Sequence, residues 1–318
     1  MMKTQSALSV LRRALLYVPS SSEKMLAKSL QTTCDNITYD LEDSVTLGEK
    51  AAARQRLAHH LGALRQRPPG VGELAVRINA VSTGLAAHDL AAIKKSPVLD
   101  ALVVPKVNGA SDLKFVADHL RDGSRSESAP RPRLIALIES ARAVMDLREI
   151  CNATPDLDGL IFAAEDFALD LSLTRTPSFT EFLFARSAIV TAARAFNIPN
   201  TIDMVCTAYK GPDAESTLRA ECLDGKQMGF NGKQCIHPSQ ISTVQTMFGP
   251  SGEEVEWAIR VVIADARASA RGQGAWTLDS KMIDAPVIGK AAAIVAAAEK
   301  TGFDMAALRN KWQHQQPE

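Results

Sequence analysis

The sequence carries no excess charge of either sign. Thirty-six Lys and Arg residues balance 36 Asp and Glu residues, and no basic run or RNA-binding motif occurs among the 318 residues. A chain without a net positive field does not attract a polyanion. Nucleic acid is therefore disfavoured as a partner.

Long hydrophobic runs and cysteine pairs are also missing. The apolar stretches fall well short of the roughly 20 residues that a membrane span needs, so we expect no association with a membrane. The five cysteines are odd in number and far apart, and no C-x-x-C pair is present to hold zinc or to exchange electrons. We interpret them as buried thiols of a reducing, intracellular compartment.

The first 22 residues contain no acid, but they include Lys3, Arg12 and Arg13. This composition faintly resembles a mitochondrial presequence. Because ALLYV at residues 14–18 already has the character of a core strand, any presequence would be very short. We expect a mitochondrial matrix location if the chain is eukaryotic and a cytoplasmic one otherwise.

Eight short apolar, β-branched runs recur between residues 14 and 238, and segments with helical periodicity separate them. Near-continuous apolar runs are typical of parallel strands covered on both faces. The pattern predicts an α/β fold, a (β/α)8 TIM barrel over residues 12–250. A doubly wound open sheet is the alternative, but it usually has fewer strands and a glycine-rich first turn, and no G-x-G-x-x-G motif or P-loop occurs here. The runs are ALLYVP, NITYDLED, ELAVRIN, ALVVPK, RLIALIES, GLIFAAED, NTIDMV and GKQCIHP.

The pattern changes after the eighth run. Residues 253–271 have the spacing of one long amphipathic helix, and RGQGAWTLDSKM, with two glycines in three residues, predicts a flexible joint. A helix beginning at Asp284 and Pro286 follows, and then a short helix through Trp312. Residues 251–318 are therefore predicted to be a hinged helical extension and lid.

Charged side chains stand at the ends of five successive predicted strands, where the active sites of such barrels lie. A single charged residue at the rim commonly has no role beyond contact with solvent. Several acids and bases that converge on the same end of a barrel indicate a functional site. The residues are Asp40, Glu42 and Asp43 after the second run, Arg77 and Asn79 after the third, Lys106 after the fourth, Glu139 after the fifth, and Glu165 and Asp166 after the sixth.

Glu139 and Asp166 follow neighbouring strands, and two carboxylates at that separation can share Mg²⁺, which keeps positions for water and substrate. Zinc is not indicated, because no His or Cys stands nearby. Such a metal could polarise a 2-oxo or 2-hydroxy carboxylate. Arg77 suits a carboxylate or a developing enolate oxygen, and its structural alternative is a salt bridge to Glu42 or Asp43.

Eight segments together resemble the citrate lyase beta subunit family of HpcH/HpaI aldolases, and most closely its citrate lyase beta-like members. They are RRALLYVPSSSEKMLAKS, ITYDLEDSV, VRINA, VVPK, LIALIESARAV, FAAEDF, MGFNGKQCIHPSQ and SKMIDAP, in order from about residue 12 to residue 300. The resemblance implies a (β/α)8 barrel, a homotrimer with shared active sites, Mg²⁺ and a coenzyme A (CoA) thioester substrate. It implies a carbon–carbon lyase that cleaves (3S)-citramalyl-CoA to acetyl-CoA and pyruvate, with malate synthase activity in the reverse sense.

By the resemblance, Glu139 and Asp166 are the metal ligands and Arg77 is the substrate arginine. Asp284 is the acid that a C-terminal lid inserts into a neighbouring subunit's site, although on sequence alone a helix N-cap two residues before Pro286 is the alternative. Lys24 and Lys28 fall where the family contacts CoA, and their alternative is a solvated helix face.

Three further residues complete the set. We add Glu42 to the catalytic residues and Lys106 to the substrate-binding residues. His237 is expected to end the eighth strand and to pack there, since nothing beside it in the sequence would fix its tautomer.

Other functions stay open. A citrate lyase beta subunit would act on a citryl thioester of an acyl-carrier protein together with partner chains, and the segment ITYDLEDSV and the long C-terminal extension argue against it. Malyl-CoA lyase or thioesterase activity needs the same metal site. A catalytically silent binding barrel is disfavoured by the intact set of Arg77, Glu139, Asp166 and Asp284.

Overall fold

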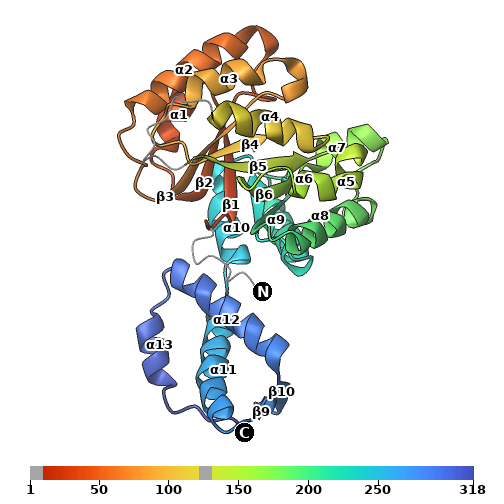
Figure 1. Cartoon of the computed structure of the whole chain (residues 1–318). Helices are drawn as coiled ribbons and strands as arrows, with labels where there is room; N and C mark the ends of the chain where they lie inside the picture. The colour runs from red at the N-terminus through yellow and green to blue at the C-terminus, as the bar shows by residue number, and fades with distance from the viewer. Residues whose placement is uncertain (1–9, 122–130) are drawn as a thin grey trace. The chain divides into compact units, whose positions relative to one another are not determined.

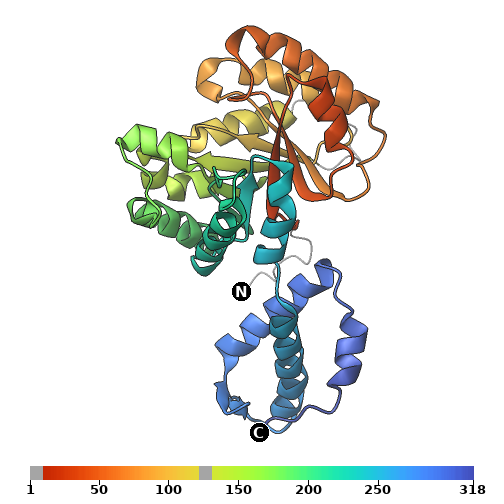
Figure 2. The same ribbon diagram turned by 180° about the vertical axis from the view of Figure 1, so that it is seen from behind.

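The computed structural model describes residues 10–121 and 131–318. Eight parallel strands follow one another around a closed barrel, and helices lie outside them (Figures 1 and 2). The predicted (β/α)8 barrel is confirmed. The strands are β1 (Ala14–Pro19), β2 (Cys34–Asp40), β3 (Val71–Arg77), β4 (Ala101–Val104), β5 (Arg133–Ile138), β6 (Leu157–Phe162), β7 (Asn200–Asp203) and β8 (Gly232–Cys235).

The helices between and after these strands follow the predicted periodic segments, with one break. The segment 140–150, expected as one helix, divides at Asp146. The helices are α1 (Glu23–Ser29), α2 (Lys50–Ala63), α3 (Ala86–Ile93), α4 (Ala110–Arg121), α5 (Ala141–Met145), α6 (Leu147–Cys151), α7 (Ala164–Leu171), α8 (Leu183–Ala195), α9 (Ala214–Gln227) and α10 (Ile241–Phe248).

The barrel closes because β1 pairs with β8 as well as with β2, so that Leu15 lies opposite Gln234. Its interior is a packed core of mostly branched aliphatic side chains. Because all eight barrel strands are parallel, their carboxyl ends lie at one rim. The interior residues are Leu15, Ala75, Ala101, Val103, Ile135, Leu137, Ile161 and Ile202.

The opposite end of the barrel is held by a buried arginine. The guanidinium of Arg12 donates to Glu73 through Nε and Nη2, both at 2.7 Å, and to Asp158 through Nη1 at 2.6 Å. Arg13 pairs in the same way with Asp35. Two of the three basic residues that give the N-terminus its presequence-like composition therefore belong to the barrel, and Lys3 lies outside the described residues.

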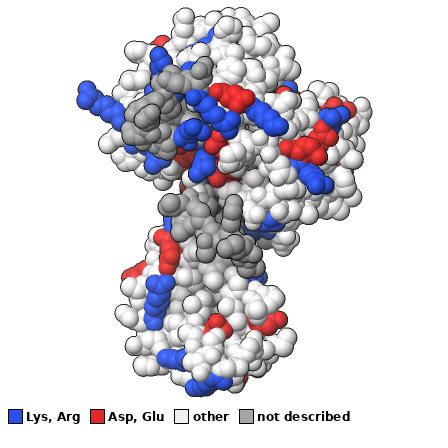
Figure 3. Space-filling model, viewed as in Figure 1, with Lys and Arg blue, Asp and Glu red and all other residues white. Residues whose placement is uncertain are grey.

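The balanced composition is visible on the surface. On the face seen in Figure 3, acidic and basic side chains lie beside one another. All five cysteines are buried and none forms a disulfide, as expected. No helix in the described part of the chain is long and apolar enough to cross a membrane.

The chain divides into two compact units, Met1–Gln245 and Thr246–Glu318. The second unit contains α11 (Gly252–Ala270), β9 (Trp276–Leu278), β10 (Lys281–Ile283), α12 (Ala285–Lys300) and α13 (Met305–Lys311). The prediction of a flexible joint at residues 271–282 is wrong in part, because β9 and β10 form an antiparallel hairpin there. Its Trp276, Leu278 and Ile283 are buried in the core of this unit, and that burial orders the segment.

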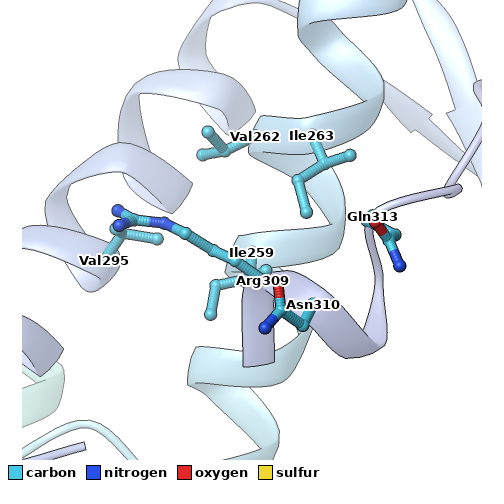
Figure 4. Close-up of a pocket in the computed structure, with 7 residues that line it drawn as sticks. All are labelled: Ile259, Val262, Ile263, Val295, Arg309, Asn310 and Gln313. Carbon is cyan, nitrogen blue, oxygen red and sulfur yellow. The ribbon is translucent and has the colours of Figure 1, made fainter. Parts of the chain in front are cut away.

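Two hollows stand out among the described residues. One, of about 320 Å³, lies between α11, α12 and α13, where Arg309 extends past Ile259 toward Val295 (Figure 4). The other, of about 540 Å³, lies between residues 175–179 and α9. Neither is lined by Arg77, Glu139 or Asp166.

Candidate active site

Arg77, the last residue of β3, is fixed in a rigid contact with the last residue of β2. Its Nε and Nη2 donate to the two carboxylate oxygens of Asp40, each at 2.7 Å, and its guanidinium carbon lies 4.6 Å from the centre of the Tyr17 ring. The salt-bridge alternative therefore exists, but its main partner is Asp40. Nη1 points toward Glu42 (3.1 Å) and Asp43 (3.4 Å). This edge of the guanidinium is directed at the rim.

Glu42 lies in the loop just beyond β2 and is nearly buried. Lys50 Nζ holds this loop by donating to the carbonyl oxygens of Leu41 and Glu42. Burial raises the pKa of Glu42 to about 7, although Arg77 opposes the change. Its Oε2 has no hydrogen bond of good geometry despite its ion pair with Arg77.

Glu139 and Asp166 are brought to the same rim, as predicted, but by different elements. Glu139 directly follows β5, whereas β6 ends at Phe162 and Asp166 lies in the first turn of α7. The expectation that Glu165 and Asp166 end the sixth strand is therefore wrong. Only residues 164–166 of this segment are helical, and the carboxylates of Glu165 and Asp166 favour that first helical turn because they face its exposed N–H groups and the positive end of the helix dipole.

Lys106 lies between these acids. Its backbone N–H donates to Glu139, and its Nζ is 3.0 Å from Asp166 Oδ1 and 3.5 Å from Glu42. One residue thus contacts three carboxylates. Burial alone would lower the pKa of Lys106, but the ion pairs with these acids outweigh that effect and raise it.

The acids at this rim have the chemistry of a magnesium site. Glu139 is only 5% exposed, and burial together with repulsion from Asp166 and Glu42 raises its pKa to about 8. A divalent cation would relieve that repulsion, and carboxylate oxygens are its preferred ligands. Among residues 10–121 and 131–318, no three His, Cys, Asp or Glu side chains are grouped as a metal cage. A pair of carboxylates completed by water and substrate fits Mg²⁺ better than such a cage.

A family model described as HpcH/HpaI aldolase/citrate lyase matches residues 13–238, the whole barrel with all the rim residues above. The chain belongs to this family. Arg77, Glu139 and Asp166 all lie within the matched region.

Named relatives match over most of the chain. The mitochondrial citramalyl-CoA lyase of Homo sapiens is 34% identical over 88% of this chain and 83% of its own length. The citrate lyase subunit beta of Escherichia coli strain K12 is 35% identical over 92% of this chain and 95% of its own length. The citramalyl-CoA lyase and the citrate lyase beta subunit thus match this chain with about the same identity.

The solved structures include one of protein CitE from Mycobacterium tuberculosis in complex with magnesium, acetoacetate and coenzyme A. It superposes with a TM-score of 0.73 at 30% identity, over 92% of this chain and 100% of that chain. This structure and the citrate lyase beta subunit of M. tuberculosis complexed with oxaloacetate and magnesium (TM-score 0.62, 28% identity, 76% of this chain and 99% of that one) both hold magnesium.

Sequence reasoning missed two polar residues beneath this rim. Tyr17, whose ring lies beneath Arg77, donates from its hydroxyl to Gln234 Oε1 at 3.1 Å, and Gln234 Nε2 in turn donates to the carbonyls of Phe162 and Asp203. The signal that could have found them is their position: both lie on inward-facing strand positions near the carboxyl ends. Polar side chains there are buried in the barrel mouth.

His237 differs from its prediction. It lies two residues beyond β8, and the backbone N–H of Ser239 donates to its Nδ1 at 3.2 Å. That bond makes Nδ1 an acceptor and places the proton of the neutral ring on Nε2. The expectation that nothing nearby sets its tautomer is wrong, and the ring stacks on Tyr209 at 5.2 Å between centres.

The remaining predicted residues lie on other elements. Lys24 and Lys28 are exposed on α1, the helix that follows β1 at the rim. Asp284 lies in the second unit, where it caps α12 by accepting from the N–H of Val287 at 3.3 Å. The cap predicted from Pro286 is confirmed, and the role of Asp284 as an acid stays a prediction.

Proposed function

We propose that this chain is a magnesium-dependent carbon–carbon lyase that cleaves a 3-hydroxyacyl-CoA, in first place (3S)-citramalyl-CoA to acetyl-CoA and pyruvate, with malate synthase activity in the reverse sense. The observation that carries the proposal is the convergence of Arg77, Glu139 and Asp166 on one rim of a family barrel. The citramalyl-CoA lyases and the CoA-bound structure among the relatives support it.

The proposed reaction removes the proton of the substrate hydroxyl, breaks the adjacent carbon–carbon bond and leaves a thioester enolate that must be protonated. Magnesium held by Glu139 and Asp166 would lower the pKa of that hydroxyl and orient the neighbouring carboxylate. Glu42 faces the mouth with a pKa of about 7, which suits a base that accepts the proton near neutral pH. Arg77 Nη1 faces the place where enolate charge develops, and Asp284 would supply the final proton.

A direct assay tests this function. We expect purified chain with Mg²⁺ to cleave citramalyl-CoA with a higher kcat/KM than malyl-CoA or citryl-CoA, and to release pyruvate and acetyl-CoA in equal amounts. Release of free CoA thiol instead would indicate thioesterase activity. No turnover of any of the three thioesters would contradict the proposal.

The citrate lyase beta subunit is the second candidate, because the E. coli subunit is as similar as the human lyase. It would act on a citryl thioester of an acyl-carrier protein. The same assay separates the two, since turnover of free CoA esters by the chain alone needs no carrier protein or partner subunit.

We also propose a homotrimer with shared sites. Five large apolar side chains are exposed on α5, α7 and α8, and such a group on one side of a barrel is typical of a subunit interface. They are Met145 (73% exposed), Leu169 (81%), Leu171 (38%), Leu183 (52%) and Phe184 (71%). The compartment stays a prediction, and the names of the mammalian relatives, which are mitochondrial citramalyl-CoA lyases, support a mitochondrial location for a eukaryotic chain.

Two variants of Asp284 separate its role as the N-cap of α12 from its proposed role as a catalytic acid. Asp284→Asn keeps a good N-cap and removes the acid, whereas Asp284→Ala also loses about 1 kcal/mol of helix stability. If Asp284 donates the proton, both variants lose activity to the same extent and only the alanine variant has a lower Tm. Wild-type turnover by Asp284→Asn would assign the residue to capping alone.

Subunit mixing tests whether the site is shared. Asp284→Asn and Glu139→Gln chains, each inactive, are mixed and allowed to exchange subunits. In random 1:1 mixtures about one quarter of shared sites combine an intact metal pair with an intact acid, so we expect up to that fraction of wild-type activity. No recovery despite exchange demonstrated by mass spectrometry would mean that each chain completes its own site.

A further inference from the structure

We propose that the Lys106 ammonium and Mg²⁺ compete for the same carboxylates, so that metal binding displaces this side chain from Asp166. The inference rests on the proposed metal site. It concerns what Lys106 does before the metal binds, and it changes the assignment of Lys106 from a substrate contact to a positioning residue.

The contacts of Lys106 carry the first step of the argument. Nζ lies 3.0 Å from Asp166 and 3.5 Å from Glu42, while the backbone N–H of the same residue donates to Glu139. The ammonium thus compensates the negative charge that a divalent cation would compensate. When Glu42, Glu139 and Asp166 are all ionised, the three carboxylates and the one ammonium leave two negative charges, apart from the Asp40–Arg77 pair.

The backbone supplies an independent observation. Lys106 has φ +50°, a left-handed conformation that is uncommon for a residue other than glycine. Such a conformation is strained and persists where the surroundings impose it, as at functional sites. Here it lets one residue present both its N–H and its ammonium to the acids.

The two cations of the rim differ in their freedom to move. The Arg77 side chain is 11% exposed and held by two hydrogen bonds to Asp40, so it cannot leave. The Lys106 side chain is 39% exposed, and it ends in a single flexible ammonium. When Mg²⁺ takes Asp166, like-charge repulsion acts on Lys106, and the side chain can turn toward solvent at the mouth.

Magnesium affinity measures the competition without any turnover. In isothermal titration calorimetry of the full chain without substrate, Lys106→Gln is expected to bind Mg²⁺ about tenfold more tightly than wild type, because one positive charge a few ångströms from the metal is removed. Lys106→Arg keeps the charge and is expected to stay within about twofold of wild type. Lys106→Gly, which accepts the positive φ without strain, serves if the glutamine variant folds poorly, and it too should bind more tightly.

A second readout follows the side chain itself. Reductive methylation with ¹³C labels the lysines, and the Lys106 signal, identified by its loss in Lys106→Arg, should shift when Mg²⁺ alone is added. An unchanged or weaker Mg²⁺ affinity in both neutral variants would overturn the inference. An unshifted Lys106 signal would do the same.

The outcomes separate this inference from the proposed function. If Glu139→Gln abolishes Mg²⁺ binding but the neutral Lys106 variants bind no more tightly than wild type, the metal site stands and the competition fails. If wild type binds no Mg²⁺, or Glu139→Gln binds it as well as wild type, the proposed site and this inference fail together.

Discussion

Replacing Glu139 with Gln is expected to lower magnesium-dependent turnover at least about a thousandfold. The amide still accepts the N–H of Lys106 but does not provide a charged metal ligand. A catalytic metal is worth several kcal/mol of transition-state stabilisation, and each 1.4 kcal/mol is a factor of ten. Turnover is measured across a Mg²⁺ titration, and Mg²⁺ binding by calorimetry.

Stability distinguishes loss of the metal from loss of the fold. The folded-state pKa of Glu139, about 8, is above its ordinary value of 4.5, so in metal-free protein this carboxyl destabilises the fold increasingly as pH rises from 4.5 through 8. Glu139→Gln removes that effect. We expect the metal-free variant to match wild type near pH 4 and to be more stable than wild type at pH 8 to 9, as followed by urea unfolding.

Asp166→Ala is the companion variant. Asp166 is about a third exposed, so its removal should change the free energy of unfolding little while turnover is lost. Full activity of Asp166→Ala at saturating Mg²⁺ would contradict the metal assignment. This argument from exposure applies to Asp166 and not to Glu139, because the Glu139 side chain is buried.

Arg77→Lys is expected to lower kcat about 10²–10³-fold, the typical cost of one lost donor to developing negative charge. A lysine cannot hold both oxygens of Asp40 and still direct a second nitrogen at the rim, as Nη1 does in the 3.1 Å approach to Glu42. The measurement is kcat and KM separately. An altered KM with unchanged kcat would place Arg77 in ground-state binding.

Arg13→Lys is the matched control for this variant. At the opposite end of the barrel, Arg13 donates hydrogen bonds to the Asp35 carboxylate through Nε and Nη2, both at 2.9 Å. The two substitutions break the same kind of bidentate pair and should lower stability in a similar way. Only Arg77→Lys should lower kcat, and an equal loss in Arg13→Lys would point to a general loss of folded protein.

Much of the fold could be predicted from the sequence because each strand is buried on both faces. Runs such as ALVV and RLIALI report that burial directly, and Glu139, which directly follows the second of them, marks a strand's carboxyl end. Arg77 and Glu139 could be nominated for this reason, whereas Asp166 was placed at the right rim but on the wrong element, since it lies in the first turn of α7. The hairpin at Trp276 could not, since its order comes from packing in the second unit and its glycines suggest the opposite.

The sequence by itself determined the number of barrel strands, the rim on which the polar residues lie and the residue types available for chemistry, since these depend on periodicity along the chain. Only the tertiary structure decided which side chains meet. Closure of the barrel brings Gln234 to Tyr17, and the turn at Lys106 brings its ammonium to Asp166, 60 residues away. Such pairings depend on distance and direction in space, which the local sequence pattern does not encode.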